Sequence, residues 1–216
     1  MREEREVISL MKRYKIMLTG PSGSGKDTMA DLISDIIPNC HLLSFATKVK
    51  SITDNVLQYL EKEERIPLDF LKNLQSTDEA KWRLIMRPFW QWFGTDLVRN
   101  MVDNDYWIWQ VATQMNFVRN FSSGHYDGST ASFVVTDCRF KNECQWGIDN
   151  DFVIVRISGQ WRKPTGIPGH ASEHEHTELM EHLWYKNQGS LDDMRTWITE
   201  VLLPFCDAYQ DVEKEL

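Results

Sequence analysis

The sequence predicts an α/β fold in which a mostly parallel sheet is covered by helices on both faces. Short apolar runs of strand length alternate with longer segments whose apolar residues recur at helical spacing. A glycine-rich turn follows the first apolar run directly. Because parallel strands are joined by crossover helices, this alternation favours a three-layer arrangement.

Length and composition fit one such domain. The chain has 216 residues, of which 42% are hydrophobic and 26% charged, as in ordinary globular enzymes. Its net charge of -8 argues against a nucleic-acid binder, because phosphate backbones attract clustered Lys and Arg. No apolar run approaches the roughly 20 residues that span a bilayer, and residues 1–11 lack a signal-peptide core. We therefore expect a cytoplasmic protein (host cytoplasm if viral) with no nucleic-acid or membrane partner.

The first half of the chain begins with a strand and ends in a long helical region. Its expected elements are a strand at 14–19, a helix at 26–37, a strand at 41–45, a helix at 48–60 and a mostly helical region at 78–118. Pro38 ends the first helix. Pro88, Gly94 and the Asp103–Asn104 pair are expected to break the last region.

The second half completes the sheet. Its expected elements are a surface loop at 121–130, strands at 131–136 and 152–157, a loop at 159–169, a strand at 183–185 and a helix at 191–203. The loop at 159–169 holds two prolines and three glycines as well as Arg162 and Lys163. This composition predicts a mobile loop.

The run Gly20–Lys26 matches the Gly-x4-Gly-Lys loop that cradles phosphates. Its glycines let backbone N–H groups point at the phosphates, and Lys26 adds a positive charge. The following helix presents its positive N-terminal end to the same anion. The alternative is a glycine turn without a ligand, which the strand before it and the helix after it disfavour. The run therefore predicts a three-layer P-loop NTPase fold.

The residue after Lys26 departs from the general pattern. Ser or Thr usually stands there and its hydroxyl holds Mg²⁺, whereas here Asp27 is followed by Thr28. A carboxylate can ligate Mg²⁺ directly or through water, and its charge beside phosphates is favourable only with the metal present. We expect Asp27 to help hold Mg²⁺ and Thr28 to contact the nucleotide.

The strand expected at 131–136 is followed by Asp137 and Arg139. Ligands of α/β sheets bind at the carboxyl ends of the strands. Asp137 can hold water on Mg²⁺ there, and Arg139 can neutralise charge on a phosphoryl group in transfer. The alternative is a salt-bridged turn in which Glu143 caps the next helix, and the residues alone leave both interpretations open.

The segment at 87–99 sets arginines among aromatic residues. The planar fork of Arg87 suits a phosphate monoester, and Gln91 can hydrogen-bond a base edge. Thr95 is also a plausible helix N-cap. Trp107 offers a face for base stacking, with packing in the core as its alternative.

The histidine-rich segment holds His170, His174, His176 and His182. No pair has the helical spacing with a catalytic Glu that marks a zinc motif. Ser172 instead suggests an N-cap, with Glu175 completing a capping box. This pattern favours a capped helix over a metal site.

In their order along the chain, these motifs resemble the bacteriophage deoxynucleoside monophosphate kinases. The matching parts are Gly25–Thr28, the block from Gln91 to Asp96, Tyr106–Trp107, Asp137 with Arg139, and Asn187–Leu191. The resemblance runs from about Lys15 to about Leu203. It implies an NMP-kinase-like P-loop fold and transfer of the γ-phosphate of ATP to a deoxynucleoside monophosphate (dNMP), with Mg²⁺.

The resemblance also implies roles for residues. The residues it implies for ATP binding are Gly23, Ser24, Gly25, Lys26, Asp27 and Thr28. The residues it implies for dNMP binding are Lys50, Arg87, Gln91, Gly94, Thr95 and Trp107. Lys26, Asp137 and Arg139 are the candidate catalytic residues, and Asp27 and Asp137 are the candidate metal ligands. Arg99 has no counterpart in the family pattern, and the segment before Arg87 is shorter than in the best-known member.

We therefore expect one kinase domain over residues 1–216, with an acceptor-binding helical segment at about 47–118 and a lid loop at about 159–170. Oligomeric state is open, with a homodimer as one expectation. Two other functions are considered: a P-loop kinase for another small phosphorylated or sugar-acid acceptor, and an ATP-binding module without acceptor chemistry. The aromatic segment suits a base better than a sugar, and the chain is short for a motor with partner domains.

Overall fold

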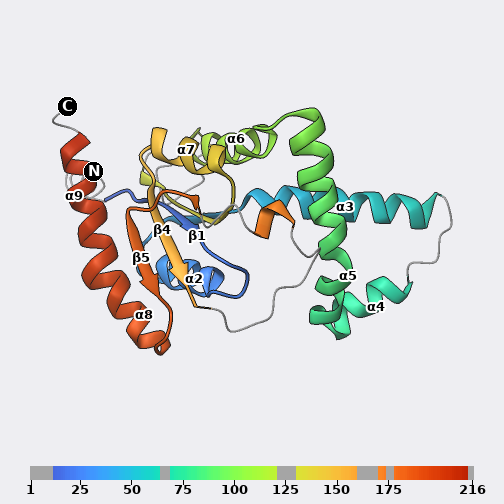
Figure 1. Cartoon of the computed structure of the whole chain (residues 1–216), viewed down its shortest axis with the longest axis horizontal. Helices are drawn as coiled ribbons and strands as arrows, with labels where there is room; N and C mark the ends of the chain where they lie inside the picture. Colours follow the sequence, from blue (N-terminus) through green and yellow to red (C-terminus); the bar gives the residue numbers. More distant parts are fainter. Residues whose placement is uncertain (1–11, 64–68, 121–129, 160–169, 174–177, 214–216) are drawn as a thin grey trace, which may run out of the picture.

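A five-stranded, all-parallel sheet forms the centre of the molecule, whose computed structural model is shown in Figure 1. Its strands are β1 (Lys15–Thr19), β2 (Cys40–Leu43), β3 (Ser132–Cys138), β4 (Val153–Ser158) and β5 (Leu183–Lys186). They lie in the order β2-β3-β1-β4-β5, and every neighbouring pair is parallel. The predicted α/β class is confirmed, and this strand order is consistent with a P-loop kinase fold.

The structure describes residues 12–63, 69–120, 130–159, 170–173 and 178–213. Two predicted segments fall largely outside these ranges. They are the surface loop at 121–130, of which only Thr130 is described, and the candidate lid with Arg162 and Lys163.

Helices surround the sheet on both faces. They are α2 (Lys26–Ile36), α3 (Phe45–Lys62), α4 (Asp69–Thr77), α5 (Glu79–Gln91), η1 (Trp92–Val102), α6 (Tyr106–Asn120), α7 (Lys141–Asp149), η3 (Ala171–Glu173), α8 (Leu191–Trp197), η5 (Ile198–Leu202) and α9 (Leu203–Glu213). Of these, η1 and η5 are π-helices and η3 is a 3₁₀ turn. None of the described helices combines the length and apolar character that a bilayer crossing requires.

The side chains of β1 show why the fold has three layers. Ile16 and Leu18 are fully buried on one face, in a cluster that includes Met29 of α2 and Ile198 of η5. Met17 is fully buried in the cluster on the other face, with residues of α3, α6 and α7. Successive strand residues point to opposite faces, so one short apolar run supplies both cores.

The helical region expected at 78–118 differs from its prediction. Neither Pro88 nor Gly94 breaks it, because α5 contains Pro88 and η1 continues the helix through Gly94. Met86 and Val98 are buried on either side of these two residues, so packing overrides the local preference. The chain leaves the helix only at Asp103, where the predicted break is confirmed.

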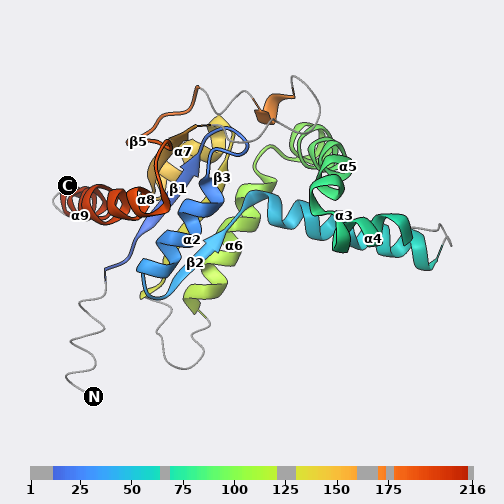
Figure 2. The ribbon, with the colours of Figure 1, turned by 90° about the horizontal axis from the view of Figure 1, so that it is seen from below.

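The helical arms lie at opposite ends of the molecule. Figures 1 and 2 both show α8 and α9 beside β5, and α3, α4 and α5 projecting from the opposite side of the sheet. The helix predicted at 191–203 continues to Glu213. Pro204 lies within this continuous run, directly after the π-helix η5.

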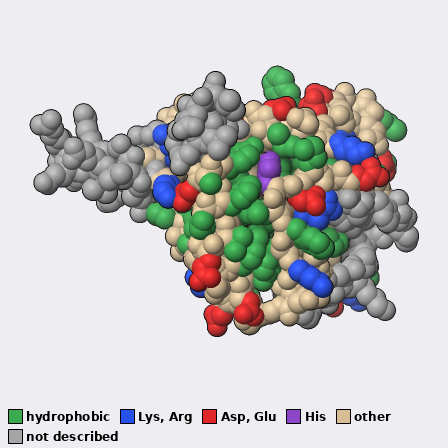
Figure 3. Space-filling view, turned by 60° about the vertical axis from the view of Figure 1, so that its left-hand side comes forward, with side chains coloured by type: hydrophobic (Ala, Val, Ile, Leu, Met, Phe, Trp, Pro, Cys, Tyr) green, Lys and Arg blue, Asp and Glu red, His purple; other side chains and the backbone are tan. Residues whose placement is uncertain are grey.

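Charges of both signs are mixed on the surface. On the face in Figure 3, the coloured Lys and Arg side chains stand among Asp and Glu, around a hydrophobic area with a histidine at its centre. Ion pairs elsewhere in the described residues follow the same mixing: Lys15 lies 2.8 Å from Asp151, and Arg156 lies 2.8 Å from Glu181. These residues therefore present a field of mixed sign.

Candidate active site

The glycine loop connects the end of β1 to the start of α2. Its glycines Gly20, Gly23 and Gly25 have φ values of 140°, 75° and 100°, a region that favours glycine. A Cβ atom at Gly20 would lie 2.2 Å from the carbonyl oxygen of Ile157 on β4. The loop can therefore keep this path only without a side chain at Gly20.

The side chain of Lys26 folds back over this loop. Its Nζ lies 2.9 Å from the Gly20 carbonyl oxygen and 2.7 Å from that of Pro21, and the residue is buried. An ammonium group donates up to three hydrogen bonds, so these carbonyls hold the charge beside the loop. The charge of Lys26 therefore lies at the loop, and its role at a phosphate site stays a prediction.

Two buried hydroxyls belong to the loop and to the strand that leads into it. Within the described part of the chain, Thr19 Oγ1 and Ser24 Oγ are buried without a hydrogen-bond partner. The backbone of Ser24 is fixed from the far end of the sheet, because Asn187 Nδ2 donates to its carbonyl oxygen at 2.8 Å. Buried hydroxyls without partners are unfavourable, so these two are available to a ligand bound at the loop.

The first turn of α2 offers a ligand for a metal ion. Asp27 and Thr28 are both exposed there, directly after Lys26. Mg²⁺ is commonly bound by one or two carboxylates together with substrate phosphates and waters. Asp27 therefore fits Mg²⁺ at this loop.

The carboxylate of Asp137 is engaged by α3. Its Oδ1 accepts from the Phe45 N–H at 2.8 Å, and its Oδ2 accepts from Ser44 Oγ at 2.8 Å and from the Ala46 N–H at 2.9 Å. Negative charge is favourable at a helix N-terminus, so Asp137 anchors the start of α3. Because both oxygens are engaged in this way, Asp137 would act on a metal only through water.

The acceptor segment reaches the glycine loop through Arg87. Its Nη1 donates to Ser22 Oγ at 3.2 Å, which joins α5 to the loop across 65 positions of sequence. The structure therefore brings together a predicted acceptor residue and the predicted nucleotide loop. Sequence reasoning did not identify Ser22 as the partner of Arg87.

Lys50 lies on the same side of the molecule. This exposed residue of α3 has its Nζ 5.3 Å from the centre of the Trp90 ring, within cation–π range. Trp90 is held in turn, because its Nε1 donates to Thr53 Oγ1 at 3.0 Å. The aromatic segment thus orients Lys50.

Gly94, Thr95 and Trp107 lie deeper than expected. Thr95 is buried inside η1, so the predicted N-cap at Thr95 is wrong: helix precedes it as well as follows it. A Cβ at Gly94 would lie 3.1 Å from Val49 Cγ2, which shows how closely η1 approaches α3. Trp107 is 4% exposed and its Nε1 donates to the Gly94 carbonyl at 2.7 Å. Its ring therefore packs in the core beneath η1, and this does not fit the expected stacking on a base.

Arg139 and Glu143 form a tight turn after β3. Glu143 Oε2 accepts from the backbone N–H of Arg139 at 2.9 Å and of Phe140 at 3.1 Å. The predicted cap by Glu143 at the start of α7 is therefore present, and a role of Asp137 and Arg139 in phosphoryl transfer stays a prediction. Burial raises the pKa of Glu143 to about 7. The charge of Asp137 also raises this pKa, while the backbone hydrogen bonds and Arg99 lower it only in part.

Arg99 is part of this support. Its guanidinium carbon lies 3.8 Å from the centre of the Phe140 ring, and its Nη1 lies 3.9 Å from Glu143 Oε1. It also donates to Asn142 Oδ1 and to the Asn104 carbonyl. Arg99 is buried, so its contacts explain it as a link between η1 and α7.

The described histidines are used individually. His182 Nδ1 accepts from the Ile154 N–H at 2.9 Å, and His170 Nδ1 lies 2.9 Å from Ser172 Oγ. Ser172 lies inside the turn η3, so the N-cap expected there is wrong; Glu175, His174 and His176 fall outside the described residues. Among the residues that are described, no three His, Cys, Asp or Glu side chains gather to hold a metal.

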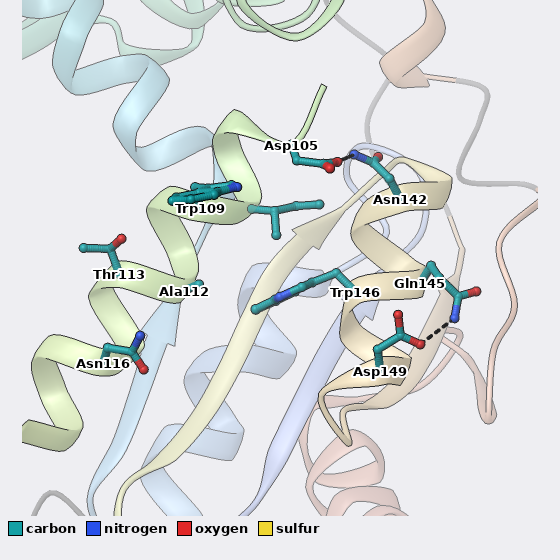
Figure 4. A pocket seen from close by; sticks show the side chains of 10 residues that line it. Asp105, Trp109, Ala112, Thr113, Asn116, Asn142, Gln145, Trp146 and Asp149 are labelled. Atoms are coloured by element: carbon teal, nitrogen blue, oxygen red, sulfur yellow. Dashed lines mark hydrogen bonds between the residues drawn. The ribbon is translucent and has the colours of Figure 1, made fainter. Parts of the chain in front are cut away.

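A separate groove lies between α6 and α7. It has a volume of about 630 Å³, and Figure 4 shows Trp109 and Trp146 on its two sides. Asp105 accepts from Asn142 at one end of the groove, and Asp149 accepts from Gln145 at the other. The groove has none of the expected nucleotide or acceptor residues in its lining, so it is distinct from the candidate site.

A family model described as deoxynucleotide monophosphate kinase matches residues 63–198. The matched region holds Arg87, Gln91, Asp137 and Arg139, and the glycine loop precedes it. No curated protein matches the chain. Since the match covers more than half of the sequence and agrees with the strand order, the chain belongs to the deoxynucleotide monophosphate kinase family, which are phosphotransferases that use ATP.

Proposed function

We propose that this protein transfers the γ-phosphoryl group of ATP to a dNMP, with the glycine loop holding the donor and the α5 side holding the acceptor. The observation that carries the proposal is the 3.2 Å contact between Arg87 Nη1 and Ser22 Oγ. It puts an acceptor-side guanidinium directly beside the loop. Phosphoryl transfer needs little covalent chemistry from the protein beyond such positioning and charge neutralisation.

On the donor side, the loop's backbone N–H groups from Gly23 to Lys26 bind the phosphates of ATP. Lys26 exchanges the carbonyl oxygens of Gly20 and Pro21 for phosphate oxygens, so its charge is already in place. Asp27 and Thr28 would hold Mg²⁺ and contact the nucleotide, with Asp137 acting through water; the ion supplies further charge neutralisation.

On the acceptor side, Arg87 binds the dNMP phosphate through its planar fork and Lys50 adds a second charge. Gln91 hydrogen-bonds the base edge. Gly94 and Thr95 form the floor of the dNMP site, since Gly94 lets η1 approach α3 closely. Trp107 supports this floor from the core instead of contacting the base.

Between the two substrates, Arg139 neutralises charge on the phosphoryl group in transfer. Its backbone is fixed by Glu143. The candidate lid at about 159–170, with Arg162 and Lys163, would close over the site and exclude water. The lid stays a prediction, as do the single-domain boundaries, a homodimer, a cytoplasmic location and a bacteriophage origin.

The test is turnover with each of the four common dNMPs in the presence of ATP and Mg²⁺, measured as formation of both ADP and dNDP. We expect stoichiometric ADP and dNDP with at least one of them. ADP formed at the same rate with and without dNMP, and no dNDP, would overturn the proposal and favour an ATP-binding module without acceptor chemistry.

The metal role has its own variant. Asp27→Asn keeps the size of the side chain and removes its charge, so we expect activity to require a higher Mg²⁺ concentration. Asp31→Asn is the matched control, because Asp31 is exposed one turn further along α2. Unchanged Mg²⁺ dependence in Asp27→Asn would remove Asp27 from the site.

A further inference from the structure

A buried hydrogen-bonded junction lies where the acceptor segment meets the end of β3. We call it the Ser172 junction. Ser172 Oγ accepts from Gln91 Nε2 at 3.3 Å and lies 2.9 Å from His170 Nδ1. Its carbonyl oxygen accepts from Arg139 Nη1 at 3.0 Å. One residue of η3 thus contacts two residues of the proposed site, one on the acceptor side and one on the transfer side.

The hydrogen bonds define which proton lies where. The Ser172 N–H points at His170 Nδ1 at 3.3 Å, so Nδ1 is an acceptor. Since Gln91 Nε2 can only donate, the Ser172 hydroxyl accepts a hydrogen bond from it and donates one to His170 Nδ1. A neutral imidazole that accepts at Nδ1 carries its proton on Nε2. The Nε2–H of His170 is therefore the remaining donor of the junction.

That donor faces Asp96. His170 is buried, and its Nε2 lacks a hydrogen-bond partner among the described residues, while Asp96 Oδ1 of η1 lies 3.5 Å away. A buried donor without a partner is unfavourable, so a small approach of η1 would complete the bond. Asp96 follows Gly94 and Thr95, the two residues of η1 that we assign to the dNMP site.

We propose that His170 and Ser172 are positioning residues that set Gln91 and Arg139 together, and that a hydrogen bond from His170 Nε2 to Asp96 ties the junction to η1. This inference rests on the proposed function, because it takes its site residues from there. Ser172 acts through two separate groups: its hydroxyl orients Gln91, and its carbonyl orients Arg139. His170 fixes both, because it binds the hydroxyl and the N–H of the same residue.

The two groups predict different kinetics. Ser172→Ala removes the hydroxyl and keeps the carbonyl, so KM for the dNMP should rise while kcat changes little. His170→Ala releases the whole turn, so kcat/KM for the dNMP should fall on the order of 10- to 100-fold, with a lower kcat as well. KM for ATP should stay unchanged in both, since neither residue contacts the glycine loop in the interactions above.

Conservative replacements separate positioning from folding. His170→Asn places an oxygen where Nδ1 lies, so it should restore the Ser172 contacts and recover most of kcat. It cannot reach Asp96, so Asp96→Ala, which removes the acceptor oxygens, should cost much less activity in His170→Asn than in the wild type. His41→Ala, whose Nε2 lies 3.1 Å from Asn39 Oδ1 beside β2, controls for loss of a part-buried histidine.

The wild type and the variants test different claims. Wild-type dNDP formation tests the proposed function, and its absence would overturn that function and this inference with it. With an active wild type, kinetic constants within about twofold of wild type in both Ser172→Ala and His170→Ala would overturn the junction alone. Equal losses in His170→Ala and His170→Asn, matched by equally lowered unfolding temperatures, would reduce His170 to a structural residue and also overturn it.

Discussion

The glycine loop and the acceptor side of the site are built in different ways. The loop is a contiguous stretch from Gly20 to Lys26 whose shape comes from its own glycines and whose charge folds onto its own carbonyls. The proposed acceptor side takes single residues from α3, α5 and η1. A contiguous motif can be recognised in the sequence alone, whereas a dispersed site is formed only when the chain has folded.

The largest effect is expected at the loop's only lysine. Lys26→Met removes a positioned charge from the phosphates, and losing one such stabilising group costs on the order of 1000-fold in kcat/KM. Steady-state kinetics with ATP and the preferred dNMP measure it. Lys15→Met, on β1, is the control, because it loses only contacts outside the loop, with Asp151 and with the Asn150 carbonyl oxygen. Similar activities in the two variants would contradict a local origin of the loop's function.

The two close-approach glycines sharpen the comparison through stability. Gly20→Ala places a methyl group against a backbone oxygen that cannot move, at a φ of 140°, and should lower the free energy of unfolding by about 3 kcal/mol or more. Gly94→Ala meets only the movable methyl groups of Val49 and gains helix propensity of about 1 kcal/mol. Its net change should stay within about 1 kcal/mol of zero. Urea unfolding measures both, and equal losses would show that η1 is as rigid as the loop.

A smaller and more selective effect is expected at Arg87. Arg87→Ala removes the bridge between the two regions, so kcat/KM for the dNMP should fall on the order of 10- to 100-fold while KM for ATP changes little. Arg87→Lys should recover only part of the loss because it lacks the fork. Arg83→Ala, an exposed arginine one turn earlier on α5, is the control. A larger change in KM for ATP than for the dNMP would assign Arg87 to the donor.

The smallest effect concerns pH. Burial raises the pKa of Glu143 from 4.5 to about 7, so between these values the folded protein binds more protons than the unfolded chain. Its stability should therefore fall as pH rises through this window, by up to about 1.4 kcal/mol per pH unit. Glu143→Gln keeps an oxygen for the two N–H donors and should flatten this slope in urea unfolding. Glu200→Gln, at an exposed position of η5, should leave the slope intact.

The sequence predicted the parts of the fold whose signals are local. The β1 strand, the glycine loop and the start of α2 follow from an apolar run, from glycines and from Lys26. The breaks at Pro88 and Gly94 were predicted wrongly, because burial on both sides of them outweighs the cost of each residue. Sequence spacing cannot measure that burial.

The candidate site shows the same limit. The sequence predicted Arg87 and Asp137 as site residues, yet Ser22 as the partner of one and the start of α3 as the partner of the other come only from the fold. Trp107 shows it most clearly: its aromatic ring suits both a core and a base, and only its burial and its bond to Gly94 decide between them. Pairings across many residues of sequence leave no periodic signal.

The bond from Asn187 to the Ser24 carbonyl has a consequence for synthesis of the chain. Gly20 lies against β4, and Ser24 is fixed from the residue that follows β5, so the two contacts that frame the loop come from the last third of the sequence. During translation the loop leaves the ribosome early, and these partners leave it late. Pairing of distant parallel strands is also slow compared with helix formation. The emerging polypeptide therefore carries the motif well before the motif reaches its folded shape.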